Sequence, residues 1–249
     1  MAQVQKRDSL LDLNRSAVSR YIQLATLFRQ RIESGTWPVG AQIPIIDELV
    51  AECGVARATI RQALGVLEDE GLLARYRAKG TFVLRRAAEG LWCEMESDWQ
   101  GLLTAREGAV IKLIRSELVS GLPAWPHRIG EPAGSYRRLR RHHWRDNRPY
   151  LVADVYVDAE LARKVPKLAF TTQTAMRLAA SLPGVEIADA RQTLTVASAD
   201  VEAAAALEVP LNAPVAHVHR SVVDQHGRLV LAAFGIYRGD VVRVDVKLK

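Results

Sequence analysis

Two short segments with helical periodicity, joined by a turn that contains a glycine, constrain the fold of this chain more than any other feature. Residues 47–52 fit a short helix with Leu49 and Val50 inward, and apolar residues recur at spacings of three and four from residue 56 to about residue 70. The connection between them contains Gly54, and the tight turn of a helix-turn-helix favours glycine. Residues 21–34 show the same periodicity, so we expect three helices in the first part of the chain.

A basic hairpin is expected directly after these helices. Two short apolar segments, residues 72–76 and 81–84, flank a turn at 77–80 that carries an arginine and a lysine. A charged, solvated helix on an ordinary domain would explain the basic character of this region by itself. The order of helix, glycine turn, helix and basic hairpin instead favours a winged helix-turn-helix that binds DNA.

Polar side chains on the third helix and on the hairpin suit DNA contacts. A recognition helix places its first turns in the major groove. There, arginine pairs with guanine, glutamine pairs with adenine, and threonine reaches a phosphate or a thymine methyl group. The candidate contacts are Arg57, Thr59, Arg61 and Gln62 on the helix, with Arg77 and Lys79 on the hairpin reaching phosphates or the minor groove.

Residues 21–83 resemble the winged-helix domain of the GntR family of bacterial regulators. The shared residues are Tyr21, Ile32, Gly35, Pro38, Gly40, Pro44, Glu48-Leu49, Gly54-Val55, Arg57, Thr59, Arg61-Gln62-Ala63-Leu64, Leu67, Glu70-Gly71-Leu72 and Gly80-Thr81-Phe82-Val83. The resemblance implies DNA contacts from Arg57, Thr59 and Arg61 and from the wing around Lys79, Gly80 and Thr81.

Four positions depart from the family pattern. Ile45 replaces the usual Ser or Thr, Asp47 the frequent arginine before the Glu-Leu pair, and Ala56 the usual hydroxyl residue. Ala78 stands where the wing tip usually has glycine. We expect Asp47 and Ala56 to remove phosphate contacts, and Ala78 to limit how closely the wing backbone approaches the duplex.

The rest of the chain mixes strands and helices without a regular βαβ alternation, which indicates an α+β class. Strands are expected at 110–119, 136–144, 150–157, 214–223, 229–237 and 241–248, helices at 161–180 and 201–207, and a hairpin loop at 224–228. Residues 86–97 carry no strong pattern. We therefore expect a DNA-binding domain at 18–85, a linker at 86–97 and a second domain at 98–249.

This second part resembles the UTRA ligand-binding domain of HutC-like GntR regulators. The collinear landmarks are Asp146-Asn147-Arg148-Pro149, Tyr156, the strand at 192–200, Glu202, Leu207, Ala213-Pro214-Val215, Asp224, Gly227 and Tyr237-Arg238-Gly239-Asp240. The resemblance implies a chorismate-lyase-like α+β fold that binds a small-molecule effector and forms a homodimer.

One strand concentrates positive charge. Residues 128–148 hold seven arginines against two acidic residues. Alternation along a strand places Arg137, Arg141, His143 and Arg145 on one side with Leu139, and Arg138, Arg140, His142 and Trp144 on the other. Guanidinium groups bind carboxylate or phosphate, so an anionic metabolite is the simplest ligand. The alternative is a solvated basic strand, or one that forms salt bridges with Asp154, Asp158 and Glu160.

The resemblance also implies which residues bind the effector. Arg141 and His143 align with the family's paired effector-binding arginines, and the family's usual acid falls on Ala153, one position from Asp154. These departures favour a carboxylate or aromatic acid over a sugar phosphate. The full set of effector candidates is Arg141, His143, Asp154, Thr174, Tyr237 and Trp99, with ordinary packing left open for Tyr237 and Trp99.

Other functional classes find little support. The chain has no GxSxG, GxxxxGK or HExxH motif, and its two cysteines form no metal-binding pattern, so we expect neither an enzyme nor a cofactor or metal. No apolar run could span a bilayer and no signal peptide begins the chain, which predicts a cytoplasmic location. Two alternatives remain: a DNA-binding protein without an effector, and a second domain with residual lyase-like activity.

Overall fold

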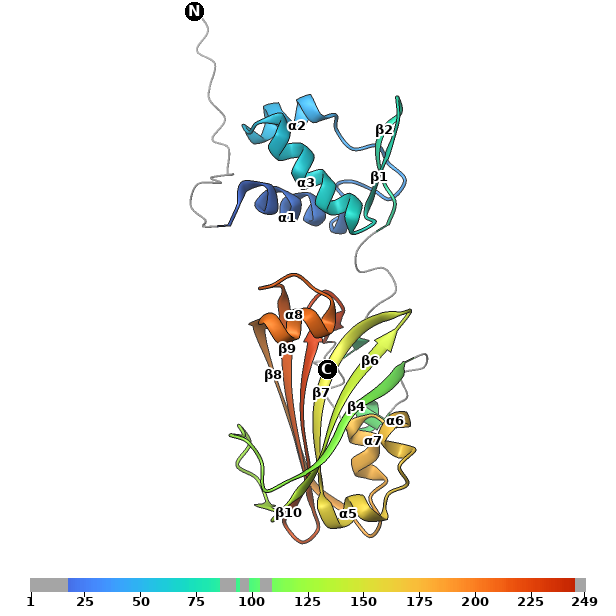
Figure 1. Cartoon of the computed structure of the whole chain (residues 1–249), viewed down its shortest axis with the longest axis vertical. Helices are drawn as coiled ribbons and strands as arrows, with labels where there is room; N and C mark the ends of the chain where they lie inside the picture. Colours follow the sequence, from blue (N-terminus) through green and yellow to red (C-terminus); the bar gives the residue numbers. More distant parts are fainter. Residues whose placement is uncertain (1–17, 86–92, 95–98, 104–108, 245–249) are drawn as a thin grey trace, which may run out of the picture. The chain divides into compact units, whose positions relative to one another are not determined.

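The computed structural model describes residues 18–85, 93–94, 99–103 and 109–244. The chain divides into two compact units, with the boundary between residues 90 and 91 (Figure 1). The first unit is helical with a small hairpin, and the second is built on a large antiparallel sheet, which confirms the α+β class. No helix among the described residues is long and apolar enough to cross a membrane.

The first unit contains the three expected helices. They are α1 (Arg20–Glu33), α2 (Ile46–Cys53) and α3 (Arg57–Asp69). Gly54 ends α2 in the left-handed region, with φ of 65°, where glycine is favoured. The apolar faces of the helices form one core with the fully buried side chains of Leu24, Phe28, Leu49 and Ile60. This core fixes which face of α3 points outward.

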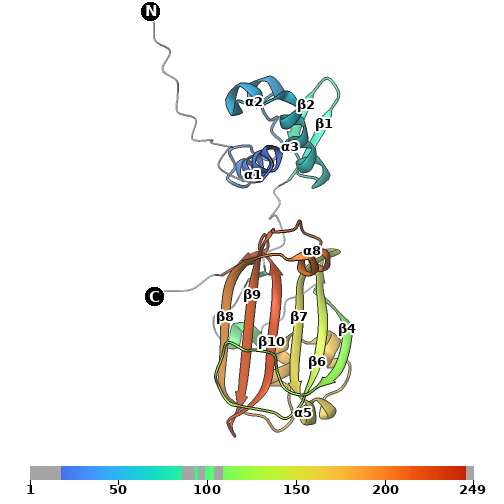
Figure 2. The same ribbon diagram turned by 60° about the vertical axis from the view of Figure 1, so that its left-hand side comes forward.

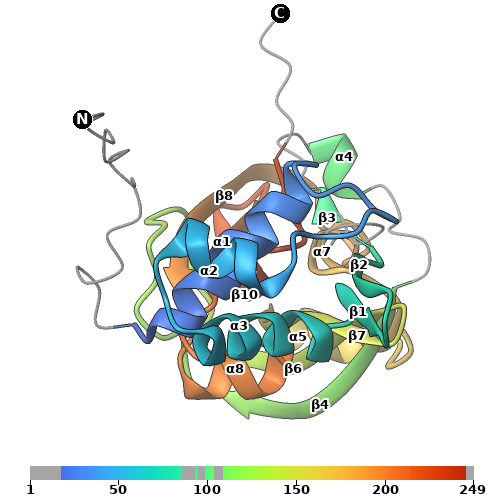
Figure 3. The same ribbon diagram turned by 90° about the horizontal axis from the view of Figure 1, so that it is seen from above.

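The predicted basic hairpin is present. Strands β1 (Leu73–Tyr76) and β2 (Gly80–Val83) pair antiparallel and follow the end of α3 (Figure 3). Ala78 adopts φ of 60° at the tip, a conformation that costs an alanine more than the glycine usual in the family. Gly80 has φ of 106°, a backbone conformation that residues with a side chain rarely adopt, so glycine is strongly favoured there.

A seven-stranded sheet forms the second unit. Six long strands run in the order β4-β6-β7-β10-β9-β8, all antiparallel, which can be followed across Figure 2. The strands are β4 (Val110–Val119), β6 (Tyr136–Arg145), β7 (Arg148–Asp158), β8 (Ile187–Ser198), β9 (Pro214–Asp224), β10 (Arg228–Arg238) and the short β5 (Glu131–Pro132), which pairs with β10. The strands expected at 110–119, 136–144, 150–157, 214–223 and 229–237 are thereby confirmed.

Helices lie on both faces of this sheet. Helices α5 (Ala159–Lys164), α6 (Ala169–Thr172) and α7 (Ala175–Ala180) cover one face and enclose the main core, and α8 (Val201–Leu207) packs on the other (Figures 1 and 2). The single helix expected at 161–180 is wrong. Pro166 lacks the N–H that a continuing helix needs and disfavours helical geometry at Val165, so the segment forms three short helices.

Two short strands correct the expected domain boundary. Strand β3 (Cys93–Glu94) pairs in parallel with β11 (Val242–Arg243), and Cys93 is buried in the core of the second unit. These two residues therefore belong to the second unit and not to a linker. The remaining residues assigned to the linker, 86–92 and 95–97, lie outside the described part of the chain, as do residues 245–248 of the expected last strand.

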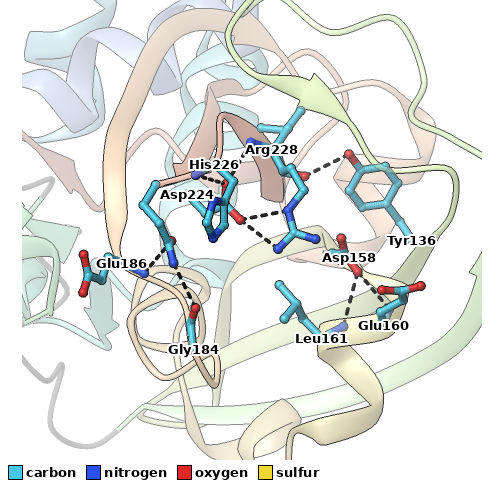
Figure 4. A network of polar contacts seen from close by, with 11 residues as sticks. Tyr136, Asp158, Glu160, Leu161, Gly184, Glu186, Asp224, His226 and Arg228 are labelled. Atoms are coloured by element: carbon cyan, nitrogen blue, oxygen red, sulfur yellow. Dashed lines mark hydrogen bonds and ion pairs between the residues drawn. The ribbon is translucent and has the colours of Figure 1, made fainter.

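The hairpin between β9 and β10 is held by a buried carboxylate. Asp224 is fully buried and accepts hydrogen bonds from the backbone N–H groups of His226 and Arg228 and from the Arg228 side chain (Figure 4). Burial acts to raise the pKa of Asp224, but these hydrogen bonds outweigh it and hold the pKa below its ordinary value. The family landmark Asp224-x-x-Gly227 thus closes the turn.

Candidate functional site

The outward face of α3 presents the predicted DNA-contacting side chains of the helix. Arg57, Arg61 and Gln62 are exposed and Thr59 is half-buried, because Ile60 and the other apolar residues of α3 occupy the core. The first turns of α3 thus offer donors that suit base edges and phosphates. Their contact with DNA stays a prediction.

The cations of this surface differ in their partners. Within the described residues, Arg61, Arg77 and Lys79 form no ion pair, whereas Arg57 pairs with Asp47. Where the family often has an arginine, this chain has Asp47, and its carboxylate binds Arg57 at the start of α3. An ion pair this exposed contributes only about 0–1 kcal/mol to folding.

The wing residues have two different roles in the structure. Arg77 and Lys79 are exposed at the tip. Gly80 and Thr81 are half-buried, and the backbone carbonyl of Thr81 accepts a hydrogen bond from Ile43 at 3.0 Å. Thr81 therefore attaches the wing to the core through Ile43, and Arg77 and Lys79 are the exposed cations at the tip. Contact of these four wing residues with DNA stays a prediction.

A cavity in the second unit lies between the sheet and the helices that cover it. Strands β6, β7, β9 and β10 form its floor, and α7 and α4 (Trp99–Leu103) close it. Helix α4 is held in place by Arg177 of α7, whose Nε donates to the carbonyl of Leu103 at 2.6 Å. The lining residues are Gly101, Leu102, Arg141, His143, Tyr150, Leu151, Ala153, Thr174, Ala175, Met176, Arg220, Ala233, Phe234, Gly235 and Tyr237. Four of the six predicted effector residues are therefore brought together.

Arg141 is the most buried cation at this cavity. Its relative exposure is 0%, and its Nη1 donates to the backbone carbonyls of Gln173 at 2.8 Å and Phe170 at 3.4 Å. Its Nε makes no hydrogen bond to any described residue, and no described carboxylate forms an ion pair with it. Burial lowers the pKa of Arg141 to about 10, opposed by Tyr237 and Tyr150, so the group remains charged at neutral pH.

Arg220 is a second cation of the cavity and was missed from the sequence. It lies on β9, where its Nε donates to the side chain of Gln192 at 2.7 Å and its Nη1 donates to the hydroxyl of Tyr237 at 3.0 Å. Its neighbours on the same face of β9, Val218 and Val222, are fully buried. An arginine that interrupts the apolar face of a strand was the signal that could have revealed it.

The other predicted lining residues have defined positions. His143 shares the cavity face of β6 with Arg141, and its ring meets the ring of Tyr150 edge to face at 6.0 Å. Thr174 caps the N-terminus of α7, where its hydroxyl accepts from the backbone N–H of Arg177 at 3.5 Å. Tyr237 contacts Arg220 from β10. These groups surround the cavity with hydrogen-bonding atoms, and their contact with a ligand stays a prediction.

Asp154, which was predicted to contact the effector, does not line the cavity. Asp154 follows Ala153 on β7, and because successive side chains alternate, Ala153 faces the cavity and Asp154 faces away. Its carboxylate binds Arg138 at 3.0 Å and Arg140 at 2.5 Å on the opposite side of the sheet. For these two arginines, the salt-bridge alternative is the correct one.

Trp99 does not line the cavity either. Its side chain packs against the apolar core of the second unit from α4, whereas Gly101 and Leu102 of the same helix form the cavity wall. Ordinary packing, the alternative left open for Trp99, describes what the structure shows.

No group of three histidine, cysteine, aspartate or glutamate side chains in the described ranges could hold a metal ion.

Comparisons with known proteins agree with both units. The family model described as bacterial regulatory proteins, gntR family, matches residues 20–83, and the UTRA domain model matches residues 111–243. The chain is 28% identical to HTH-type transcriptional regulator Rv0792c of Mycobacterium tuberculosis over 88% of this chain and 81% of that protein. It is 26% identical to HTH-type transcriptional repressor NagR of Bacillus subtilis over 90% of this chain and 93% of that protein.

A third relative and a solved structure extend the comparison. The histidine utilization repressor of Pseudomonas aeruginosa is 29% identical over 62% of each chain. The crystal structure of a GntR-family transcriptional regulator superimposes with a TM-score of 0.52 at 17% identity and covers 93% of this chain and 98% of that one, which shows the shared fold. The protein therefore belongs to the gntR family of bacterial regulatory proteins, in which it joins a helix-turn-helix domain to a UTRA domain.

Proposed function

We propose that this protein is a transcriptional repressor whose affinity for an operator is changed by an anionic metabolite that binds at Arg141. Residues 18–85 would bind DNA, and the second unit, to which Cys93 and Glu94 belong, would bind the effector and form a homodimer. A repressor is favoured because two of its relatives, NagR and the histidine utilization repressor, carry that word in their names. A regulator that binds the chromosome works in the cytoplasm.

The observation that carries the effector proposal is the environment of Arg141. A fully buried guanidinium normally has a carboxylate partner, because an unpaired buried charge is costly. Arg141 has only two backbone carbonyls, and its Nε lacks a hydrogen bond to any described residue. A ligand carboxylate or phosphate would supply the missing acceptor. Arg220, His143, Thr174 and Tyr237 line the same cavity and would orient that ligand.

The change in DNA affinity follows from linkage. A ligand shifts the protein between two states only by binding one of them more tightly, so binding at the cavity must be coupled to a state with different operator affinity. We expect the ligand to be released unchanged, since the domain acts as a sensor and not as an enzyme. Release of repression by the ligand is favoured over activation.

A thermal-shift screen tests the proposal. Purified protein is heated with sugar phosphates, amino acids, aromatic acids and dicarboxylates, and a ligand that binds the native state raises the melting temperature. A shift that is lost in Arg141→Ala and kept in Arg138→Ala, which removes an arginine from the opposite face of the same strand, supports the site. A shift from neutral compounds alone would contradict the anionic effector, and no shift at all would favour a DNA-binding protein without one.

Three further measurements test the remaining parts. Chromatography of recovered ligand distinguishes a sensor, which returns the compound unchanged, from an enzyme. Light scattering on the eluting protein reports whether a homodimer forms. Fluorescence anisotropy with a duplex selected from random DNA, with and without the ligand at one fixed salt concentration, gives the sign of the coupling.

A further inference from the structure

The ion pair between Asp47 and Arg57 has a geometry that bears on DNA recognition. Nη1 of Arg57 lies 3.0 Å from Oδ1 of Asp47, and Nη2 donates to Oδ2 at 3.2 Å. Asp47 stands in the first turn of α2, and Arg57 is the first residue of α3. The pair therefore joins the beginnings of the two helices of the helix-turn-helix, on the surface where DNA contacts are expected.

The exposure of the two side chains indicates that the pair does little to stabilise the fold. The two side chains are 59% and 60% exposed, and ion pairs in water of this kind add little to stability. What the carboxylate does fix is the direction of the guanidinium group. A long arginine side chain otherwise samples several rotamers, and a held one loses less freedom when it binds.

The pair also determines which part of the guanidinium group is left for a ligand. The carboxylate occupies one hydrogen on each terminal nitrogen, so three of the five N–H donors remain. Two of these, Nε–H and the outer hydrogen of Nη2, point in parallel. No described residue accepts from Nε of Arg57. Guanine presents two acceptors, O6 and N7, at the major-groove edge, and a parallel pair of arginine donors matches them.

The negative charge of Asp47 adds a second effect. A phosphate that bound the remaining donors of Arg57 would lie near the Asp47 carboxylate, and like charges repel. A neutral base edge carries no such penalty. The other cations of this surface, Arg61, Arg77 and Lys79, have no acidic partner in the described chain and remain suited to phosphates or to bases.

From this geometry we propose that Asp47 is a specificity-determining positioning residue. It acts through Arg57, which it directs toward a guanine of the operator and away from the phosphate backbone. The inference deepens the proposed DNA contact of α3 and rests on it. It assigns a role to a position where the chain departs from its family.

The test compares Asp47→Asn with the parent on two duplexes of equal length, one selected from random DNA by the parent and one scrambled. Glu52→Gln is the matched control, because it removes the same charge from another ion pair of the same unit, that of Glu52 with Arg31. We expect Asp47→Asn to weaken operator binding about tenfold relative to Glu52→Gln and to leave scrambled DNA unweakened. A repeated selection with Asp47→Asn should lose the preference for guanine at one position of each half-site.

Asp47→Asn is also made in an Arg57→Ala variant, to test whether Asp47 acts through Arg57. If Asp47 acts through Arg57, Asp47→Asn has no further effect there. An equal change on both duplexes, or an effect that persists without Arg57, overturns the inference. If Arg57→Ala weakens operator binding but Asp47→Asn does not, the role of Asp47 is overturned and the contact of Arg57 stands. If Arg57→Ala leaves the operator affinity unchanged, the proposed contact of Arg57 with DNA is itself wrong.

Discussion

The hydroxyl group of Tyr237 accepts a hydrogen bond from Nη1 of Arg220 at 3.0 Å, so neighbouring strands β9 and β10 each contribute a polar group to one wall of the cavity. Tyr237 is 2% exposed and Arg220 is 8% exposed. The bond fixes a cation beside the cavity, and Gln192 of β8 holds its other edge. Ligand binding should therefore depend on the Tyr237 hydroxyl through Arg220, even if the Tyr237 ring does not contact the ligand.

Changing Tyr237→Phe keeps the ring and removes the acceptor. We expect an anion found in the thermal-shift screen to bind about five to ten times more weakly, which corresponds to about 1–1.4 kcal/mol for one lost hydrogen bond. Isothermal titration measures the affinity. Tyr156→Phe is the control, since Tyr156 lies on the opposite face of the sheet with Trp125. Equal losses in the two variants would argue against a specific role for Tyr237.

Changing Arg61→Ala removes an exposed cation from α3 that has no ion pair within the described residues. If Arg61 contacts a base, operator binding should weaken by about 1–3 kcal/mol, with a smaller effect on scrambled DNA. Arg163→Ala removes the same charge from an exposed site on α5 of the second unit and should change neither affinity. Anisotropy titrations at fixed salt make the comparison, and an unchanged operator affinity would take Arg61 off the contact surface.

The turn between β9 and β10 gives a stability prediction. Asp224→Ala removes the buried carboxylate that accepts from two backbone N–H groups and from the Arg228 side chain, and should lower the free energy of unfolding of the second unit by about 2–4 kcal/mol. Gln225→Ala removes the neighbouring exposed contacts with Gly184 and Glu186 and should cost about 1 kcal/mol or less. Urea unfolding followed by circular dichroism measures both. Similar midpoints for the two variants would show that the buried carboxylate is not what holds the turn.

Stability should also fall in mild acid because of His127. Its ring bridges the hydroxyls of Ser221 and Thr193, each at 2.8 Å, and burial together with Arg191 lowers the pKa of His127, against a smaller opposing effect of Asp189. The unfolded chain then binds more protons than the folded one, so stability is complete above about pH 6.5 and decreases as the pH falls below it.

Urea unfolding at a series of pH values between 7.5 and 5 measures this slope. His127→Gln, which keeps hydrogen-bonding atoms without titrating, should reduce the slope. His219 contributes in the same direction, because burial and the neighbouring His127 and His217 lower its pKa. The slope of the variant should therefore shrink without vanishing. A variant whose slope equals that of the parent would mean that His127 does not carry the effect.

Local sequence patterns determine much of the organisation of this protein. The spacing of apolar residues determined α3, Gly54 determined the turn before it, and alternation along β6 determined that Arg141 and His143 share a side that excludes Arg138 and Arg140. Each of these depends on neighbours within one helix or one strand, so the sequence by itself is sufficient.

Only the tertiary structure decided which side of the sheet the helices cover and which residues meet there. Alternation could not tell that Ala153, and not Asp154, faces the cavity, because that depends on the register of β7 against β6 and β10. The approach of Arg220 to Tyr237 and of Asp47 to Arg57 joins different elements. Such contacts arise from packing between elements, and a pattern within one element carries no information about the partner that packing brings to it.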